Sequence, residues 1–183
     1  MRIKVAVNDA SVLIDLAYGD LVGHWFALGI ETYITDAVFT EVKAGGHARL
    51  FTKFVDAGLL KVDRISSDGA LEWLSKVQSY AESLKISFAD ATALICAEEK
   101  DAILLTGDRL LRLQAEKFGV EVCGVLWVMD MLLWEEIIGF KRAIEALNEV
   151  LSHGARLPAG DCQGRLENWR REKKTKPRGL ADK

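Results

Sequence analysis

The sequence has little of several features that define other protein classes. Two prolines and 15 glycines among 183 residues are too few for a collagen-like or Pro-rich disordered chain. No apolar run approaches the roughly 18 residues of a membrane-spanning helix. The first 20 residues carry three aspartates where a signal peptide needs an apolar stretch. We therefore expect a cytoplasmic protein without a membrane segment, folded around one sizeable core.

Cysteine is also scarce. Cys96, Cys123 and Cys162 are odd in number and far apart, they form no CxxC pair, and no histidine lies near enough to complete a zinc site. We interpret them as reduced thiols. Cys96 and Cys123 lie in apolar runs, where a free cysteine behaves as a small core hydrophobe.

The net charge of −3 hides an asymmetry. Residues 165–183 hold eight basic and three acidic residues, whereas residues 1–164 hold 16 basic and 24 acidic ones. The acidic body argues against avid, sequence-independent binding to duplex DNA. The composition turns polar after Gly154, so we expect a domain over 1–153 and a basic, partly disordered extension over 154–183, with a short helix near 165–171.

Short apolar or β-branched segments alternate with longer helical patterns. The expected strands are residues 2–8, 32–35, 59–65, 102–106 and 120–125. The expected helices are residues 12–21, 36–44, 47–57, 68–84, 87–100, 109–119, 126–138 and 141–152, with Asp36 as an N-cap. Strands separated by helices of this length predict an α/β fold, a three-layer α/β/α sandwich with a central parallel sheet.

Carboxylates follow the strands of this predicted sheet. Asp9 comes directly after the first strand and Asp108 directly after the strand at 102–106. Glu41 lies on the helix after the second strand, and Asp90 lies in the first turn of the helix that leads to the fourth strand. All four can converge at the carboxyl edge of the sheet, where ligands bind in such folds.

Each acid also has a purely structural interpretation. Ser87 and Asp90 fit a capping box, Asp108 can cap the next helix, and Glu41 can be solvated. Taken together they are harder to explain, because two carboxylates about 4 Å apart repel by roughly 4 kcal/mol at an effective dielectric constant of 20. Oxygen ligands without cysteine or histidine favour Mg²⁺ or Mn²⁺ as the counter-charge.

Four segments resemble the acidic motifs of PIN-domain ribonucleases: VNDASVLIDL (residues 7–16), FTEV (39–42), SFADATAL (87–94) and LLTGDRLLR (104–112). The resemblance spans residues 3 to about 150. It implies a PIN-like α/β/α domain, a Mg²⁺ or Mn²⁺ site formed by Asp9, Glu41, Asp90 and Asp108, and cleavage of single-stranded RNA. Many bacterial and archaeal members, the VapC class, are toxins held inactive by a small antitoxin protein.

The resemblance also implies a mechanism. A bound cation lowers the pKa of its water, which attacks phosphorus in line and leaves 5′-phosphate and 3′-hydroxyl ends. Asp9 and Asp108 would be the principal ligands, Asp90 would complete the shell, and Glu41 would hold or deprotonate the water. Ser11 and Thr106 match hydroxyls that orient the acids. The sequence departs from the pattern in having Asn8 before the first acid and no acidic residue soon after Asp108.

Other residues support weaker hypotheses. Arg109 and Arg112 follow Asp108 on one helix, where they are either solvated or contact RNA phosphates. Asp15 and Asp130 interrupt apolar helical runs and are expected at the surface or in ion pairs. The apolar helix at 126–138, with the family resemblance, suggests a homodimer.

Three other interpretations stay open. A haloacid-dehalogenase-like phosphatase also begins its sheet with an aspartate, but Ser11 stands where its second acid is required. A receiver-type phosphoacceptor needs a lysine after a late strand, and none lies near 120–125. The third is a catalytically silent PIN-fold module for binding or assembly, which the spacing of the acids in space would distinguish from a nuclease.

Overall fold

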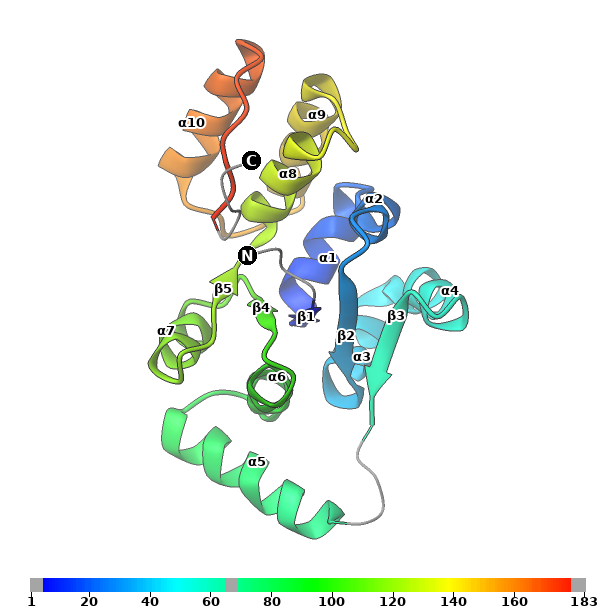
Figure 1. Cartoon of the computed structure of the whole chain (residues 1–183), viewed down its shortest axis with the longest axis vertical. Helices are drawn as coiled ribbons and strands as arrows, with labels where there is room; N and C mark the ends of the chain where they lie inside the picture. The colour runs from blue at the N-terminus through cyan, green and yellow to red at the C-terminus, as the bar shows by residue number, and fades with distance from the viewer. Residues whose placement is uncertain (1–4, 65–68, 179–183) are drawn as a thin grey trace.

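Five parallel strands form the centre of the computed structural model, which describes residues 5–64 and 69–178 (Figure 1). The strands are β1 (Val5–Asn8), β2 (Glu31–Thr35), β3 (Leu60–Asp63), β4 (Ile103–Leu105) and β5 (Val122–Cys123). Their order in the sheet is β3-β2-β1-β4-β5, and every neighbouring pair is parallel. The predicted central parallel sheet is thus confirmed. Residues 2–4, residue 65 and Asp68, which were expected in a strand or helix, lie outside the described ranges.

The direction of the crossovers decides which face each helix covers. Steps from β1 to β2 to β3 run one way along the sheet, and steps from β3 to β4 to β5 run back, so right-handed crossovers place the two groups of helices on opposite faces. The first group is α1 (Ala10–Tyr18), α2 (Val22–Ala27), α3 (Asp36–Val42) and α4 (Ala48–Asp56). The second is α5 (Ala70–Leu84), α6 (Phe88–Glu99) and α7 (Arg109–Lys117). This is the predicted three-layer α/β/α sandwich.

The helix starts show how local sequence sets these elements. Ser87 and Asp90 form the predicted capping box at the start of α6, with Asp90 N–H to Ser87 Oγ at 3.0 Å and Ser87 N–H to Asp90 Oδ2 at 3.1 Å. The N-cap of α3 is Thr35, not Asp36 as expected. Thr35 has the extended backbone that a cap requires, and its Oγ1 accepts a hydrogen bond from Val38 N–H, whereas Asp36 is already helical.

Two other elements differ from expectation. The helix predicted over 36–44 ends at Val42 and passes through a wide turn, Lys43–His47, in which Gly46 has a φ of +87°. Only glycine adopts that backbone without steric cost, so α4 can start in a new direction. The six-residue helix α2 was not predicted, because it is too short to show a periodic pattern.

The chain after β5 forms a third helical group: α8 (Val125–Trp134), α9 (Phe140–Ser152) and α10 (Ala159–Arg170). Almost all of α8 is buried, and it contacts α1, α2 and α9 of its own chain. Its apolar character is therefore explained by the core, and it does not indicate a homodimer.

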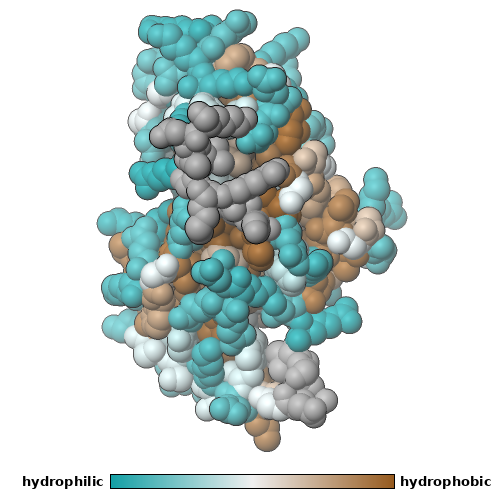
Figure 2. Space-filling view, in the orientation of Figure 1, coloured by the Kyte–Doolittle hydropathy of each residue, from teal (hydrophilic) through white to brown (hydrophobic). Residues whose placement is uncertain are grey.

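The polar segment after Gly154 contains more helix than predicted, since α10 begins at Ala159 and packs on α9. Trp169 is fully buried there although its neighbours are hydrophilic, and Figure 2 shows a largely hydrophilic surface where Figure 1 places α10. The division of the chain at residue 153 stays a prediction. Within the described residues, no helix is both long and apolar enough to cross a membrane.

Candidate active site

Asp9 is the most constrained of the four acids. It follows β1 directly, its N–H donates to the Leu105 carbonyl of β4 at 2.9 Å, and only 5% of the residue is exposed. It occupies the N-cap position of α1, yet its side chain makes no capping hydrogen bond. Instead Oδ2 accepts hydrogen bonds from Ser11 Oγ at 2.7 Å and from Thr106 Oγ1 at 2.8 Å. The carboxylate is therefore fixed by side chains and not used by the helix.

The same two hydroxyls also bind the loop after β4. Ser11 Oγ accepts from Gly107 N–H and Thr106 Oγ1 accepts from Asp108 N–H, both at 2.9 Å. Each hydroxyl thus connects the loop after β4 to Asp9, because it accepts from the loop and donates to the carboxylate. The position of Asp9 therefore depends on that of Asp108. This arrangement agrees with the supporting role predicted for Ser11 and Thr106.

Asp108 and Asp90 are each held through one carboxylate oxygen. Asp108 is the N-cap of α7, and its Oδ1 accepts from Leu111 N–H at 2.7 Å. Asp90 uses Oδ2 in the capping box of α6. The structural interpretation of both residues is therefore correct, and it leaves one oxygen of each carboxylate without a hydrogen bond among the described residues.

Glu41 lies near the end of α3, on a helix that a buried contact joins to α6. Thr35 Oγ1 and Thr92 Oγ1 are 2.7 Å apart, and Thr92 also donates to the Ala89 carbonyl at 2.7 Å. This contact fixes α3, which carries Glu41, against α6, which carries Asp90. Sequence patterns give little sign of this contact, since its only signal is a hydroxyl at the end of β2 and another at a buried position of α6.

The electrostatics indicate that the acids lie near one another. Partial burial raises the pKa of Glu41, and the charges of Asp9 and Asp90 raise it further. Burial likewise raises the pKa of Asp90, which the charges of Asp9 and Asp108 also raise against the opposing hydrogen bonds from Ser87. Each of the four acids is thus coupled to at least one of the others.

Comparisons with known proteins show the family to which the chain belongs. The family model DUF3368, described as a PIN domain, matches residues 5–171. The chain is a PIN-domain protein. It also resembles the crystal structure of PAE2754 from Pyrobaculum aerophilum, with a TM-score of 0.52, 21% sequence identity, and coverage of 72% of this chain and 98% of that chain. At this identity the likeness bears on the fold alone. A comparison with curated proteins gave no match.

As a PIN domain, the chain has a nuclease fold, and PIN nucleases typically use divalent metals. In the part of the chain that the structure describes, no three acidic, histidine or cysteine side chains lie close enough to form a ready metal site. The donor chemistry nevertheless fits Mg²⁺ or Mn²⁺. Asp9, Asp90 and Asp108 each offer one carboxylate oxygen that no described residue binds, while the other oxygen anchors the side chain.

The two arginines proposed for this PIN domain differ in their surroundings. Arg112 donates to the Val122 carbonyl at 3.0 Å and to the Thr106 carbonyl at 3.2 Å, so it joins α7 to β4 and β5. The Arg112 guanidinium therefore has a structural role beside the site. Arg109 is exposed, in the first turn of α7, and makes no side-chain hydrogen bond or ion pair among residues 5–64 and 69–178.

Two polar residues near Asp9 are buried or half-buried. Asp15 was predicted at the surface or in an ion pair, but it is half-buried and no cation pairs with it in the described residues. Burial, with the charge of Asp9, raises the pKa of Asp15 to about 6. Asn8 is fully buried, and neither amide atom has a hydrogen-bond partner in the described structure. Asp130 is buried and paired with Arg165 at 2.7 Å, as its prediction allowed.

Proposed function

We propose that the chain is a Mg²⁺- or Mn²⁺-dependent endoribonuclease that hydrolyses phosphodiester bonds of single-stranded RNA. The observation that carries the proposal is the carboxylate of Asp9 at the carboxyl edge of a parallel sheet, where two hydroxyls hold it and its charge adds to burial in raising the pKa of Glu41 and of Asp90. Membership of the PIN family supports it. The catalytically silent module is less favoured, because Glu41, Asp90 and Asp108 are partly or largely exposed and the charges of neighbouring acids act on one another.

The chain's own residues supply the positions that such chemistry needs. Asp9 and Asp108 would hold the cation through the oxygens that no described residue binds, and Asp90 would complete the shell directly or through water. When bound, the cation would lower the pKa of a water molecule and neutralise charge on the phosphate. Glu41 would hold and deprotonate the attacking water. Its raised pKa suits this role, because a base is most effective when its pKa approaches the working pH.

We further propose, from the resemblance alone, that the chain is the toxin of a toxin–antitoxin pair, inhibited by a small antitoxin protein. The same resemblance suggests a homodimer, whose interface would lie outside the buried helix α8. Light scattering over micromolar concentrations tests the dimer. A monomer at every concentration in this range would show that the homodimer hypothesis is wrong.

The first test is cleavage of a mixed pool of single-stranded RNA by the purified chain, with Mn²⁺ or with EDTA. We expect cleavage with Mn²⁺ alone, and a loss of at least about 100-fold in Asp9→Asn. Asp101→Asn is the matched control. Asp101 precedes β4 at the opposite edge of the sheet, and its φ of +48° is one that asparagine also tolerates.

Three outcomes are informative. Metal-dependent cleavage that Asp9→Asn abolishes and Asp101→Asn retains supports the nuclease. Cleavage that persists in Asp9→Asn assigns the activity to a contaminant or another site. Absence of cleavage in the metal-loaded chain, free of any antitoxin, favours the binding module.

A further inference from the structure

A groove of about 570 Å³ opens beside the acids, at the carboxyl ends of β4 and β5. Thr106 and Gly107 form the wall that it shares with the site, since Thr106 hydrogen-bonds Asp9 and Gly107 directly precedes Asp108. This volume falls in the range of small-ligand sites. A substrate lying across the acids would therefore extend directly into the groove.

The C-terminal segment forms the far wall of the groove. After α10 the chain turns back and runs beside that helix toward β5 and the start of α8 (Figure 1). This brings Pro177 and Arg178 to the same groove as Leu157 and Pro158. Trp127 Nε1 donates to the Arg178 carbonyl at 3.2 Å and so holds the segment on α8.

The lining is strongly cationic, with six arginine or lysine residues and two aspartates. Asp130 neutralises Arg165, which donates to Oδ2 from Nε at 3.0 Å and from Nη2 at 2.7 Å. The other Asp130 oxygen is buried and accepts no hydrogen bond from any described residue.

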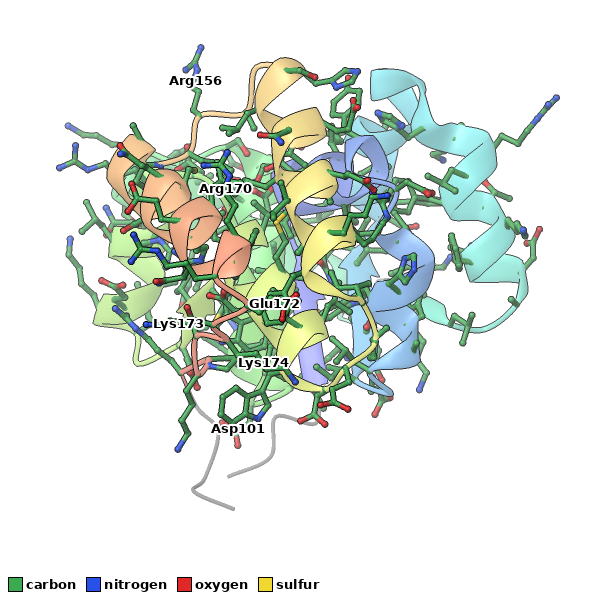
Figure 3. All side chains as sticks on the ribbon, turned by 90° about the horizontal axis from the view of Figure 1, so that it is seen from above. Asp101, Arg156, Arg170, Glu172, Lys173 and Lys174 are labelled. Carbon is green, nitrogen blue, oxygen red and sulfur yellow. The ribbon has the colours of Figure 1, made fainter. Side chains whose placement is uncertain are left out.

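Three arginines of the lining have no described partner that neutralises their charge: Arg109, Arg156 and Arg178. None makes a side-chain hydrogen bond or ion pair within residues 5–64 and 69–178, and all three are exposed. Figure 3 shows Arg156 extending from the loop before α10 into solvent, while Arg170 projects from the helix itself and does not line the groove. The free positive charge thus lies around the rim.

Helix geometry adds to this charge. The first residues of α7 and α8, Arg109 and Val125, line the groove, as do Pro158 and Asp161 at the start of α10. No described side chain caps α8 or α10, and Asp161 adds one negative charge to the first turn of α10. Helix N-termini carry partial positive charge and bind phosphate groups through the N–H groups of their first turns.

We propose that this groove binds the backbone phosphates of single-stranded RNA next to the scissile bond, an inference that rests on the proposed function. Arg109, Arg156 and Arg178 contact phosphates, and the apolar wall at Leu126 and Leu157 packs against sugars or bases. A single strand meets these requirements, because its splayed nucleotides present phosphates, hydroxyls and apolar faces together.

Binding can be tested without cleavage. A fluorescent 12-nucleotide single-stranded RNA is titrated with the full chain in EDTA, and the anisotropy is followed over a series of salt concentrations. We expect Arg156→Ala/Arg178→Ala to weaken binding roughly tenfold, and to reduce the slope of log K against log salt by about 0.7 for each arginine removed. Arg109→Ala is expected to act in the same direction. Arg170→Ala/Arg171→Ala removes the same charge outside the groove, so affinity and slope should stay unchanged.

The outcomes separate this inference from the proposed function. If Arg156→Ala/Arg178→Ala and Arg170→Ala/Arg171→Ala lost equal amounts of RNA affinity, the groove would not be the binding site, even if the wild-type chain cleaves RNA with Mn²⁺. If RNA binding depended on the groove arginines but Mn²⁺ gave no cleavage, the groove would still be the RNA-binding site and the proposed nuclease activity would be wrong. If a poly-glutamate peptide displaced the RNA at equal concentration of charge, the assignment to RNA would be wrong. Urea unfolding confirms that all variants are folded.

Discussion

The Thr106 hydroxyl joins two acids that lie 99 residues apart in the chain. Thr106 Oγ1 donates to Asp9 Oδ2 at 2.8 Å and accepts from Asp108 N–H at 2.9 Å. Thr106 is fully buried and lies between β4 and the start of α7. The register of β1 against β4 therefore fixes the relative position of both acids, independently of any ligand.

Replacing Thr106 with Val should weaken metal-dependent cleavage more than it weakens the fold. The variant keeps the shape but removes one of the two hydroxyls that donate to Asp9 Oδ2 and the acceptor of the Asp108 N–H, at a cost of about 1–3 kcal/mol. We expect the Mn²⁺ concentration for half-maximal activity to rise several-fold, and Thr106→Ser to restore it. The measurement is a Mn²⁺ titration of cleavage alongside urea unfolding. Unchanged Mn²⁺ dependence in Thr106→Val would show that Thr106 does not position the acids.

Asp15 should destabilise the fold at neutral pH. Its pKa is about 6 in the folded chain and near 3.8 when exposed, so the folded state binds more protons and stability falls as pH rises from about 4 to 6. Asp15→Asn should remove this dependence and raise the free energy of unfolding at pH 8 by about 1–2 kcal/mol, a value reduced for solvent screening. Urea unfolding from pH 4 to 8 tests this. The interpretation fails if wild type and variant show parallel pH profiles.

Asn8→Leu should stabilise the chain. Both amide atoms of Asn8 are buried without a partner in the described structure, and burying such a group costs about 1–3 kcal/mol. Leucine has a similar shape and needs no hydrogen bond. The matched control is Asn148→Leu on the exposed side of α9, which should change the free energy of unfolding by less than about 0.5 kcal/mol. A destabilised Asn8→Leu would mean that this amide has a partner that the described contacts lack.

Trp169→Ala should be strongly destabilising although Trp169 lies in the basic C-terminal segment. The indole is fully buried between α10 and the body, and truncating a buried tryptophan costs about 3–5 kcal/mol. Trp169→Phe should cost less, since it keeps most of the volume and removes an indole N–H that has no partner among the described residues. Urea unfolding measures both. Equal, small effects would indicate that α10 is not docked in solution.

The three cysteines should be inert in the folded protein. All are buried and free, as the sequence indicated for Cys96 and Cys123. Burial raises the pKa of Cys96 and of Cys123 to about 12, so almost no thiolate forms at pH 8. We expect a disulfide reagent to label fewer than about one thiol per native chain and all three after unfolding. Rapid labelling of the native chain would contradict this burial.

Much of the fold could be predicted because it rests on local patterns. Alternating strands and helices indicated the parallel sheet, and the capping box at Ser87 lies where the sequence placed it. The four acids could be selected because Asp9 and Asp108 follow strands, Asp90 lies in the first turn of a helix, and Glu41 lies on the helix after the second strand. The extent of α10 and the cap of α3 were missed or misplaced, since polar helices lack an apolar stripe and two neighbouring residues, Thr35 and Asp36, are both good caps.

The sequence by itself determined the order of strands and helices, the acidic residues that lie close to the ends of strands, and the excess of positive charge near the C-terminus. Only the tertiary structure decided which of those residues meet. The hydrogen bonds from Ser11 and Thr106 to Asp9 depend on the register between β1 and β4. The return of residues 175–178 to the start of α8 depends on how α10 packs against α9. Such contacts join distant segments through packing of the whole chain. The propensity of a segment for helix or strand therefore does not predict them.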